Sequence, residues 1–247
     1  VGFESSHSFR LWKTSLHNAS YALSHFHLQP TQVGLPNNRP RYYCVAVQRS
    51  SLSNHRNSEW RIGRYFSTDS AQMAGTDGPL IFASLPEFDV VPEETVDRER
   101  LPRVGTFLDN TTGDVSRLCI PDKLLDRPAS WCLDIVNAES RRTSCFTSAY
   151  GKYFKGTGSV LVYEADDSAE RRRMPRFELL PPEDREYNAD WLAPIRRNGY
   201  ALRYFSGTEL ARLFGFSETF AFPSGVTPKQ QWKLIGIQKA IHQSVHH

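Results

Sequence analysis

Apolar side chains recur at regular spacing in several short segments, and long polar stretches separate these segments. Phe9, Trp12 and Leu16 share one face of a predicted helix, because residues three and four apart lie together on a helix surface. Residues 21–28 alternate between polar and apolar, which predicts an exposed strand. The continuous apolar run at 42–47 predicts a buried strand. The pattern favours an α/β fold whose first sheet is rich in parallel strands.

Hydroxyl residues mark the starts of two helices near the end of the chain. The stretch 206–209, Ser-Gly-Thr-Glu, has the spacing of a capping box, in which a hydroxyl and a carboxylate satisfy the first N–H groups of a helix. Gly215 predicts the end of that helix. Thr227 followed by Pro228 predicts the start of the second, because proline suits the first helical position.

Two polar stretches, 48–77 and 164–198, show little periodicity and are predicted insertions. The second contains three consecutive arginines at 171–173. They could contact phosphate, but a solvated run of charge is the commoner explanation, and we assign no site to them.

Composition places the chain among globular proteins. It has 247 residues, of which 39% are hydrophobic and 23% charged, and its net charge of +3 permits a nucleic-acid partner without requiring one. We see no long apolar run, and so we expect no membrane span and no signal peptide. The four cysteines lie far apart without a Cys-x-x-Cys pair, which argues against a zinc ribbon and against a dense disulfide framework: Cys44, Cys119, Cys132 and Cys145.

The segment from Ser144 to Leu161 interleaves aromatic residues, lysines and glycines. Rings can stack on bases and lysines can contact phosphates, so a nucleic acid is one candidate ligand. The side chains that suit these roles are Tyr150, Tyr153, Phe154, Lys152 and Lys155. Composition alone favours a simpler interpretation, a glycine-rich connector with an aromatic anchor.

Several distant segments match, in order, the motifs of one family: 1–5, 29–43, 134–147, 202–216 and 222–236. The stretch 36–41, Pro-Asn-Asn-Arg-Pro-Arg, is similar to that family's Arg-x-Arg motif, and 145–147 reads Cys-Phe-Thr. On these motifs the chain resembles the C-terminal part of the tRNA cytosine-5 methyltransferases. They are the tRNA-modifying branch of the DNA cytosine-5 methyltransferase superfamily.

The resemblance implies an α/β fold in which the C-terminal part of a Rossmann-like class I methyltransferase sheet carries a small target-recognition domain. It implies three parts. Residues 1–47 would end the catalytic domain, 48–200 would form the target-recognition domain with its two polar insertions, and 201–247 would hold terminal helices that return to the catalytic domain.

The activity that the resemblance implies is methylation of cytosine carbon 5 in tRNA, at cytosine 38 of the aspartate tRNA anticodon loop. S-adenosylmethionine is the expected cofactor, and its binding residues are not assigned. Such an enzyme swings its target base out of the stack. The resemblance implies that Arg39 and Arg41 are catalytic residues. Arg41 is expected to contact the flipped pyrimidine and to hold the acidic residue, and Arg39 to support substrate and loop. Substrate-binding residues are expected at Arg141, Cys145, Thr147, Lys152 and Lys155.

Arg39, Arg41 and Cys145 also have ordinary structural explanations. Without the family context, Arg39 and Arg41 would be a surface ion-pair cluster beside a strand. Cys145 could be a small buried apolar side chain, which is common for free cysteine. We do not assign it as the nucleophile.

The chain departs from the family at two places. The family's nucleophile lies in a Pro-Cys-Gln motif, but no cysteine here follows a proline, and the Glu-Asn-Val acid and glycine-rich cofactor strand are missing. After Gly236 the family has Asn-Ser, whereas this chain has Ile237 and Gln238. We therefore expect the chain alone to be inactive.

Three hypotheses remain: the substrate-recognition half of a tRNA methyltransferase, a catalytically dead RNA-binding remnant and, ranked lower, a DNA cytosine-5 methyltransferase. The expected partner is tRNA, and the expected state is a monomer without metal or membrane. We expect the protein in the cytoplasm, with the nucleus as a second location.

Overall fold

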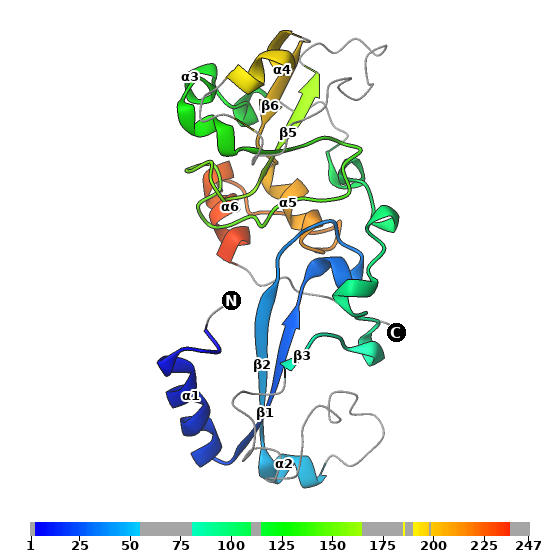
Figure 1. The fold of residues 1–247 in the computed structure, drawn as a ribbon, viewed down its shortest axis with the longest axis vertical. Helices are drawn as coiled ribbons and strands as arrows, with labels where there is room; N and C mark the ends of the chain where they lie inside the picture. Colours follow the sequence, from blue (N-terminus) through cyan, green and yellow to red (C-terminus); the bar gives the residue numbers. More distant parts are fainter. Residues whose placement is uncertain are drawn as a thin grey trace. The chain divides into compact units, whose positions relative to one another are not determined.

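The computed structural model describes residues 3–54, 81–109, 115–164, 185, 190–197 and 199–237 (Figure 1). The chain forms two compact units. The first comprises Val1–Val33 and Pro40–Val96, and the second comprises Gly34–Arg39 and Asp97–His247. The three-part division at residues 47 and 200 stays a prediction.

The first unit holds a three-stranded mixed sheet. Its order is β2-β1-β3. Strands β1 and β2 pair antiparallel along their whole length, and β3 pairs with β1 in parallel over two positions. Among the described residues antiparallel pairing therefore predominates, whereas the sequence predicted a sheet rich in parallel strands. The elements are α1 (His7–Asn18), β1 (Tyr21–Leu28), β2 (Arg41–Gln48), α2 (Arg49–Asn54) and β3 (Ile81–Phe82).

Helix α1 confirms the helix predicted around Phe9. It begins where the Ser6 hydroxyl accepts a hydrogen bond from the Phe9 N–H at 3.0 Å. Phe9 is buried, and its ring packs edge-on against His25 and Tyr42 of the sheet. The apolar face of α1 therefore covers one face of β1 and β2.

The predicted burial of the first two strands is wrong. The middle of β1, from Ala22 to Phe26, is buried, although the sequence predicted an exposed strand. Strand β2 is half-buried or exposed throughout, although a buried strand was predicted there. Strand β1 is buried because it is the central strand of the sheet. Its polar His25 can be buried because the ring forms a 2.6 Å hydrogen bond with the Tyr42 hydroxyl.

The second unit is built on another three-stranded sheet, of order β4-β5-β6. Strand β5 pairs in parallel with β4 and antiparallel with β6. Its elements are α3 (Asp122–Leu125), β4 (Asp134–Val136), β5 (Ser159–Glu164), α4 (Ala193–Arg197), β6 (Tyr200–Arg203), α5 (Gly207–Leu213) and α6 (Pro228–Ile237).

Both predicted capped helices are present. Ser206 and Glu209 form a complete capping box at the start of α5, and Gly215 adopts a left-handed φ of +79° just beyond its end. The Thr227 hydroxyl accepts from the Gln230 N–H at 3.4 Å where α6 begins. Both helices bury apolar side chains in the core of the second unit.

Most of each predicted insertion lies outside the described residues, and so does the arginine run at 171–173. Within the described ranges, every helix is too short or too polar to cross a membrane.

The protonation of His25 should make stability depend on pH. Burial, with a smaller contribution from Lys13, lowers the pKa of His25 from 6.5 to about 4. The unfolded chain therefore binds a proton below pH 6.5 that the folded chain does not accept until about pH 4. The free energy of unfolding should fall across this window as pH falls.

Urea unfolding of the wild type and of His25→Gln at pH 7.5 and 5.0 measures this contribution. The substitution should flatten the fall in stability, because glutamine does not titrate. His7→Gln is the matched control, since it makes the same chemical change at an exposed position. Parallel pH profiles for wild type and His25→Gln would contradict the prediction.

Candidate functional site

A single carboxylate closes the segment from Ser144 to Leu161 into a loop. Asp134, at the start of β4, accepts hydrogen bonds from the hydroxyls of Ser144 and Ser159 and forms an ion pair with Arg142 at 2.8 Å. Burial raises the pKa of this carboxyl, but the two hydroxyls and Arg142 outweigh that effect and lower it below its usual value. Both ends of the loop are therefore held at one point.

The inner part of the loop is an aromatic anchor. Phe146 and Tyr150 are buried, with ring centroids 5.1 Å apart in an edge-to-face arrangement. The Tyr150 hydroxyl donates to the Ser159 carbonyl at 2.7 Å and accepts from the Phe205 N–H at 3.0 Å. Burial raises its pKa well above the usual value. The prediction that Tyr150 offers a face for base stacking is wrong, because its side chain is only 4% exposed.

The outer tip of the same loop carries the predicted lysines at the surface. Tyr153 is 58% exposed, and the Lys152 ammonium lies 5.1 Å from its ring centroid. Lys155 is exposed and lies 6.0 Å from the ring of Trp131. The Thr157 hydroxyl donates to the Tyr153 carbonyl at 2.6 Å and closes the tip. The phosphate-binding roles of the lysines stay predictions.

Arg39 is buried and ties the loop to α6. Its guanidinium donates to the Phe146 carbonyl and, at 3.1 Å, to the Gly236 carbonyl. It also contacts the Cys145 sulfur at 3.4 Å and lies 5.0 Å from the ring centroid of Phe214. Because all these partners belong to the protein, the geometry gives Arg39 a positioning role within the second unit.

The remaining predicted residues lie in several places. Arg41 starts β2 in the first unit and donates to the Pro40 carbonyl at 2.8 Å. In the second unit, Arg141 donates to the Leu101 carbonyl, and the Thr147 N–H donates to the Thr157 carbonyl at 3.0 Å. Arg39 and Cys145 are in direct contact, and Thr147 lies next to α6. The functional role of each residue stays a prediction.

Helix α6 packs closely on the Cys-Phe-Thr stretch at a glycine. A Cβ placed on Gly236 would overlap the backbone of Thr147 and Ser148. Glycine is therefore needed at this position for the close approach of helix and loop.

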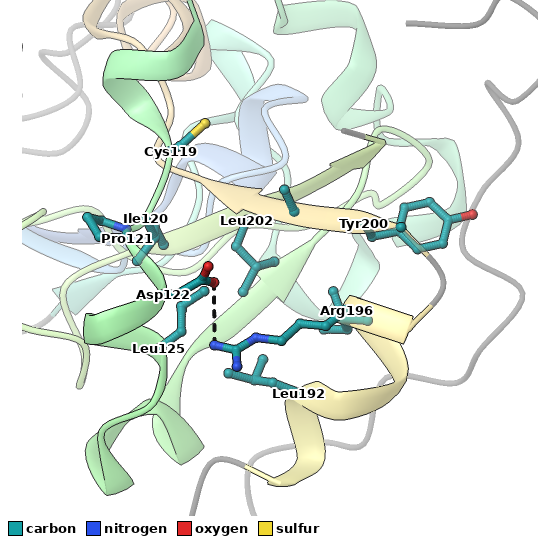
Figure 2. Close-up of a pocket in the computed structure, with 12 residues that line it drawn as sticks. Cys119, Ile120, Pro121, Asp122, Leu125, Leu192, Arg196, Tyr200 and Leu202 are labelled. Atoms are coloured by element: carbon teal, nitrogen blue, oxygen red, sulfur yellow. Dashed lines mark ion pairs between the residues drawn. The ribbon is translucent and has the colours of Figure 1, made fainter. Parts of the chain in front are cut away.

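A separate cavity of about 580 Å³ opens in the second unit between α3, α4 and β6 (Figure 2). Arg196 and Asp122 form an ion pair there at 3.6 Å. The predicted site residues are not among those lining the cavity. Among the described residues, no group of three or more histidine, cysteine or acidic side chains is placed to hold a metal ion.

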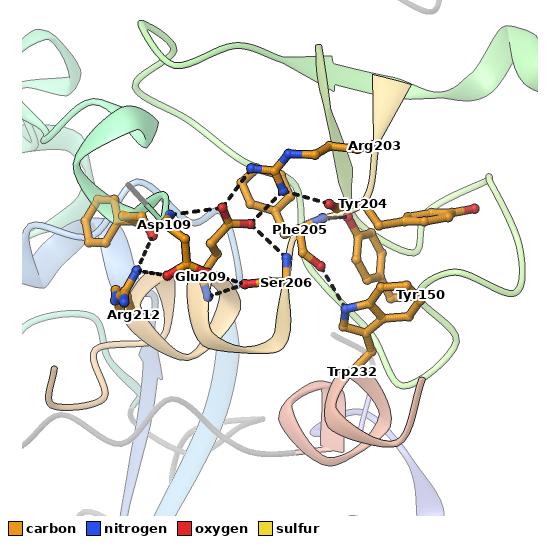
Figure 3. A network of polar contacts seen from close by, with 10 residues as sticks. Asp109, Tyr150, Arg203, Tyr204, Phe205, Ser206, Glu209, Arg212 and Trp232 are labelled. Carbon is orange, nitrogen blue, oxygen red and sulfur yellow. Dashed lines mark hydrogen bonds and ion pairs between the residues drawn. The ribbon is translucent and has the colours of Figure 1, made fainter. Parts of the chain in front are cut away.

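A buried polar network in the second unit reaches the loop through Tyr150 (Figure 3). Arg203 and Glu209 form a two-point ion pair at 2.8 and 2.7 Å, and both side chains are buried. Burial lowers the pKa of Arg203, but Glu209 raises it above the usual value overall. The Asp109 N–H donates to Glu209 at 3.1 Å, and the Asp109 carboxylate pairs with Arg212 at 2.7 Å.

The sequence reasoning missed Asp109 and Arg212 completely. Asp109 lies 100 residues before Glu209, and their contact depends on the fold. Trp131 and Arg185 were missed for the same reason, since nothing in the local pattern relates them to the loop tip.

The comparisons with known proteins agree with the family motifs found in the amino-acid sequence. No family model matches the chain. It is 30% identical to the mouse tRNA (cytosine(38)-C(5))-methyltransferase over 271 residues, which cover 98% of this chain and 62% of the mouse protein. The human tRNA (cytosine(38)-C(5))-methyltransferase is also 30% identical, over 276 residues that cover 98% of this chain and 66% of the human protein.

A Dictyostelium discoideum DNA (cytosine-5)-methyltransferase is 28% identical over 227 residues, which cover 88% of this chain and 53% of that protein. The chain therefore spans between about half and two thirds of the length of these curated relatives.

Two solved structures share the fold. The Dnmt2 methyltransferase of S. pombe superposes with a TM-score of 0.63 at 22% identity, covering 97% of this chain and 58% of that one. A DNMT2 mutant from Spodoptera frugiperda gives 0.62 at 23% identity, with coverage of 95% and 59%. The predicted α/β methyltransferase fold is confirmed.

Substitution of Glu209 by glutamine should destabilise the second unit strongly. It would leave the buried Arg203 guanidinium without its counter-charge, which costs about 3–5 kcal/mol. Urea unfolding measures the loss. Glu218→Gln makes the same chemical change at an exposed position and should have little effect. Equal unfolding free energies for the two variants would contradict the role of the pair.

Substitution of Gly236 by alanine should weaken the docking of α6. The added methyl group overlaps backbone that cannot rotate away, so we expect a loss of about 1–3 kcal/mol in the free energy of unfolding. Lys233→Ala, at an exposed position of the same helix, is the control. A wild-type unfolding midpoint for Gly236→Ala would show that the helix does not pack as described.

Proposed function

Because this chain is homologous to the tRNA (cytosine(38)-C(5))-methyltransferases along 98% of its length, we propose that it forms the substrate-recognition part of a tRNA cytosine-5 methyltransferase. The reaction is transfer of a methyl group from S-adenosylmethionine to cytosine carbon 5, at position 38 of the anticodon loop of aspartate tRNA. The single observation that carries this proposal is the ordered match of the motifs over nearly the whole chain.

The chemistry needs a thiolate that adds to cytosine carbon 6, together with charge stabilisation at O2 and N3. No cysteine of this chain follows a proline, as the family's nucleophile does. We therefore assign none of the four cysteines as the attacking thiol. S-adenosylmethionine supplies the methyl group when it is bound, and no described residue is assigned to it.

The residues of this chain bind and position the substrate. Arg41 contacts O2 of the flipped pyrimidine. A guanidinium is suited to this contact because it is planar and permanently charged. Arg39 acts as a positioning residue, because it holds the carbonyl of Phe146 in the Cys-Phe-Thr stretch and that of Gly236 in α6. Cys145 and Thr147 then form part of a wall that faces tRNA.

Cationic side chains complete the substrate contacts. Lys152 and Lys155 neutralise tRNA phosphates from the loop tip, and Arg141 lies at the entry to the same loop. We propose that the protein acts on tRNA as a monomer without metal or membrane, in the cytoplasm and also in the nucleus.

Two other functions are supported by particular observations. A catalytically dead RNA-binding remnant would explain the missing Pro-Cys and Glu-Asn-Val motifs. A DNA cytosine-5 methyltransferase is supported by the name of the Dictyostelium discoideum relative, and the Cys-Phe-Thr stretch argues against it.

The complete reading frame of the gene should encode a protein that transfers tritiated methyl groups from S-adenosylmethionine to an aspartate tRNA transcript. A transcript with uridine in place of cytosine 38 is the matched control and should accept none. Absence of transfer to the wild-type transcript would overturn the proposed activity.

The same preparation separates the alternatives. The remnant hypothesis predicts that tRNA is retained in a gel shift while calorimetry records no heat with S-adenosylmethionine. Transfer to a cytosine-containing DNA duplex but not to tRNA would instead identify a DNA methyltransferase.

A further inference from the structure

Two aromatic rings, each accompanied by a lysine, lie at the surface of the second unit. The Lys152 ammonium lies 5.1 Å from the ring centroid of Tyr153. The Lys155 ammonium lies 6.0 Å from the ring centroid of Trp131. We call the four side chains the Tyr153–Trp131 face. A cation beside a π-system is the usual composition of surfaces that stack nucleic-acid bases.

The tip that presents Tyr153 is held in place by the protein. Gly151 adopts a left-handed φ of +74°, and a Cβ at this position would overlap the Trp232 ring, so the tip packs directly on the core. The hydrogen bond from Thr157 to the Tyr153 carbonyl closes its other side. The exposed ring is therefore pre-organised, which reduces the entropy lost when it binds a partner.

Tyr153 contributes little to the core that Tyr150 anchors. Tyr150 lies three residues earlier and is 4% exposed, whereas Tyr153 is 58% exposed. Tyrosine is enriched at interfaces, because its ring offers apolar contact area and its hydroxyl stays in water.

The second ring comes from a separate part of the chain. Trp131 lies in the 3₁₀ helix Pro128–Cys132, and its side chain is half-buried. Arg185 donates to the Trp131 carbonyl at 3.1 Å and to the Leu133 carbonyl, so an arginine fixes the backbone under this ring. Its guanidinium lies 3.8 Å from the ring centroid of Trp191.

We propose that the Tyr153–Trp131 face binds unpaired nucleotides of the tRNA substrate, with bases stacked on the two rings and phosphates held by the two lysines. This inference rests on the proposed function and names the part of tRNA that this surface takes. Unpaired bases expose the faces that a ring can stack on, whereas a duplex hides them.

The chain path limits how far apart the two rings can lie. The α-carbons of Tyr153 and Lys155 are two residues apart, hence separated by about 7 Å at most. The ammonium of Lys155 in turn lies 6.0 Å from the Trp131 ring. With the lengths of the two side chains added, one single-stranded stretch of several nucleotides is long enough to reach both rings.

Fluorescence anisotropy with the full chain tests the proposal on two probes, an unstructured oligoribonucleotide and a fully paired RNA duplex of equal length at matched salt. Tyr153→Ala should weaken single-strand binding roughly tenfold and leave duplex binding and the salt dependence unchanged. Tyr153→Phe should bind as the wild type does, because it keeps the ring.

The second ring and the lysines give independent readouts. Trp131→Ala should weaken single-strand binding in the same way, with Trp131→Phe as its conservative counterpart. Lys155→Gln should weaken binding to both probes and reduce the salt slope by about 0.7 for the single strand. Leu11→Ala removes an apolar side chain of similar exposure, 57%, from the first unit and should change nothing.

Unchanged single-strand affinity in Tyr153→Ala would overturn the inference, and so would an equal loss on strand and duplex. If the wild type binds tRNA and Tyr153→Ala binds single-stranded RNA with the same affinity as the wild type, only this inference fails. If the wild type binds no RNA, the proposed function and this inference fail together.

Discussion

The buried ion pair between Arg203 and Glu209 is the constraint on which the second unit depends. Removing two charges from water costs several kcal/mol per ion, and the cost is offset only when the remaining hydrogen-bonding positions are also filled. Here both Glu209 oxygens are used, by the guanidinium and by the backbone N–H groups of Ser206 and Asp109. The pair therefore joins the end of β6, the start of α5 and a segment from far earlier in the chain in one arrangement. Phe205 between them extends this arrangement, because its N–H and carbonyl bind Tyr150 and Trp232.

This support explains how one short loop combines a rigid base with an exposed tip. Asp134 ties its two ends together, and Tyr150 anchors its middle in the core. Three residues later, Tyr153 stands in solvent beside a lysine. A buried base and an exposed ring together favour binding by stacking. Folding has already fixed the ring, so less entropy is lost when a partner binds. The same logic applies to Trp131, whose backbone is held by Arg185.

The two arginines of the Arg-x-Arg motif have different surroundings. Arg39 is enclosed by protein groups and holds the carbonyls of Phe146 and Gly236, so its contribution to the proposed reaction passes through the position of the loop and of α6. Arg41 starts strand β2 of the first unit and is half-buried, and it is the one proposed to meet the pyrimidine. The two arginines therefore lie in different environments, one buried and one half-buried.

The amino-acid sequence by itself determined the features that depend on neighbours within about four residues, and the order of the family motifs. The capping box at Ser206, the helix start at Thr227 and the helix around Phe9 are of this kind, because a helix N-terminus is satisfied by side chains close to it in sequence. Only the tertiary structure decided which strand is buried, because burial is set by partners distant in sequence. The alternating β1 became the central strand and the apolar β2 stayed half-exposed. It likewise decided that Tyr150 is core and Tyr153 surface, and it brought Asp109 to Glu209 across 100 residues. A local pattern carries no information on such contacts, since they form only when the chain closes on itself.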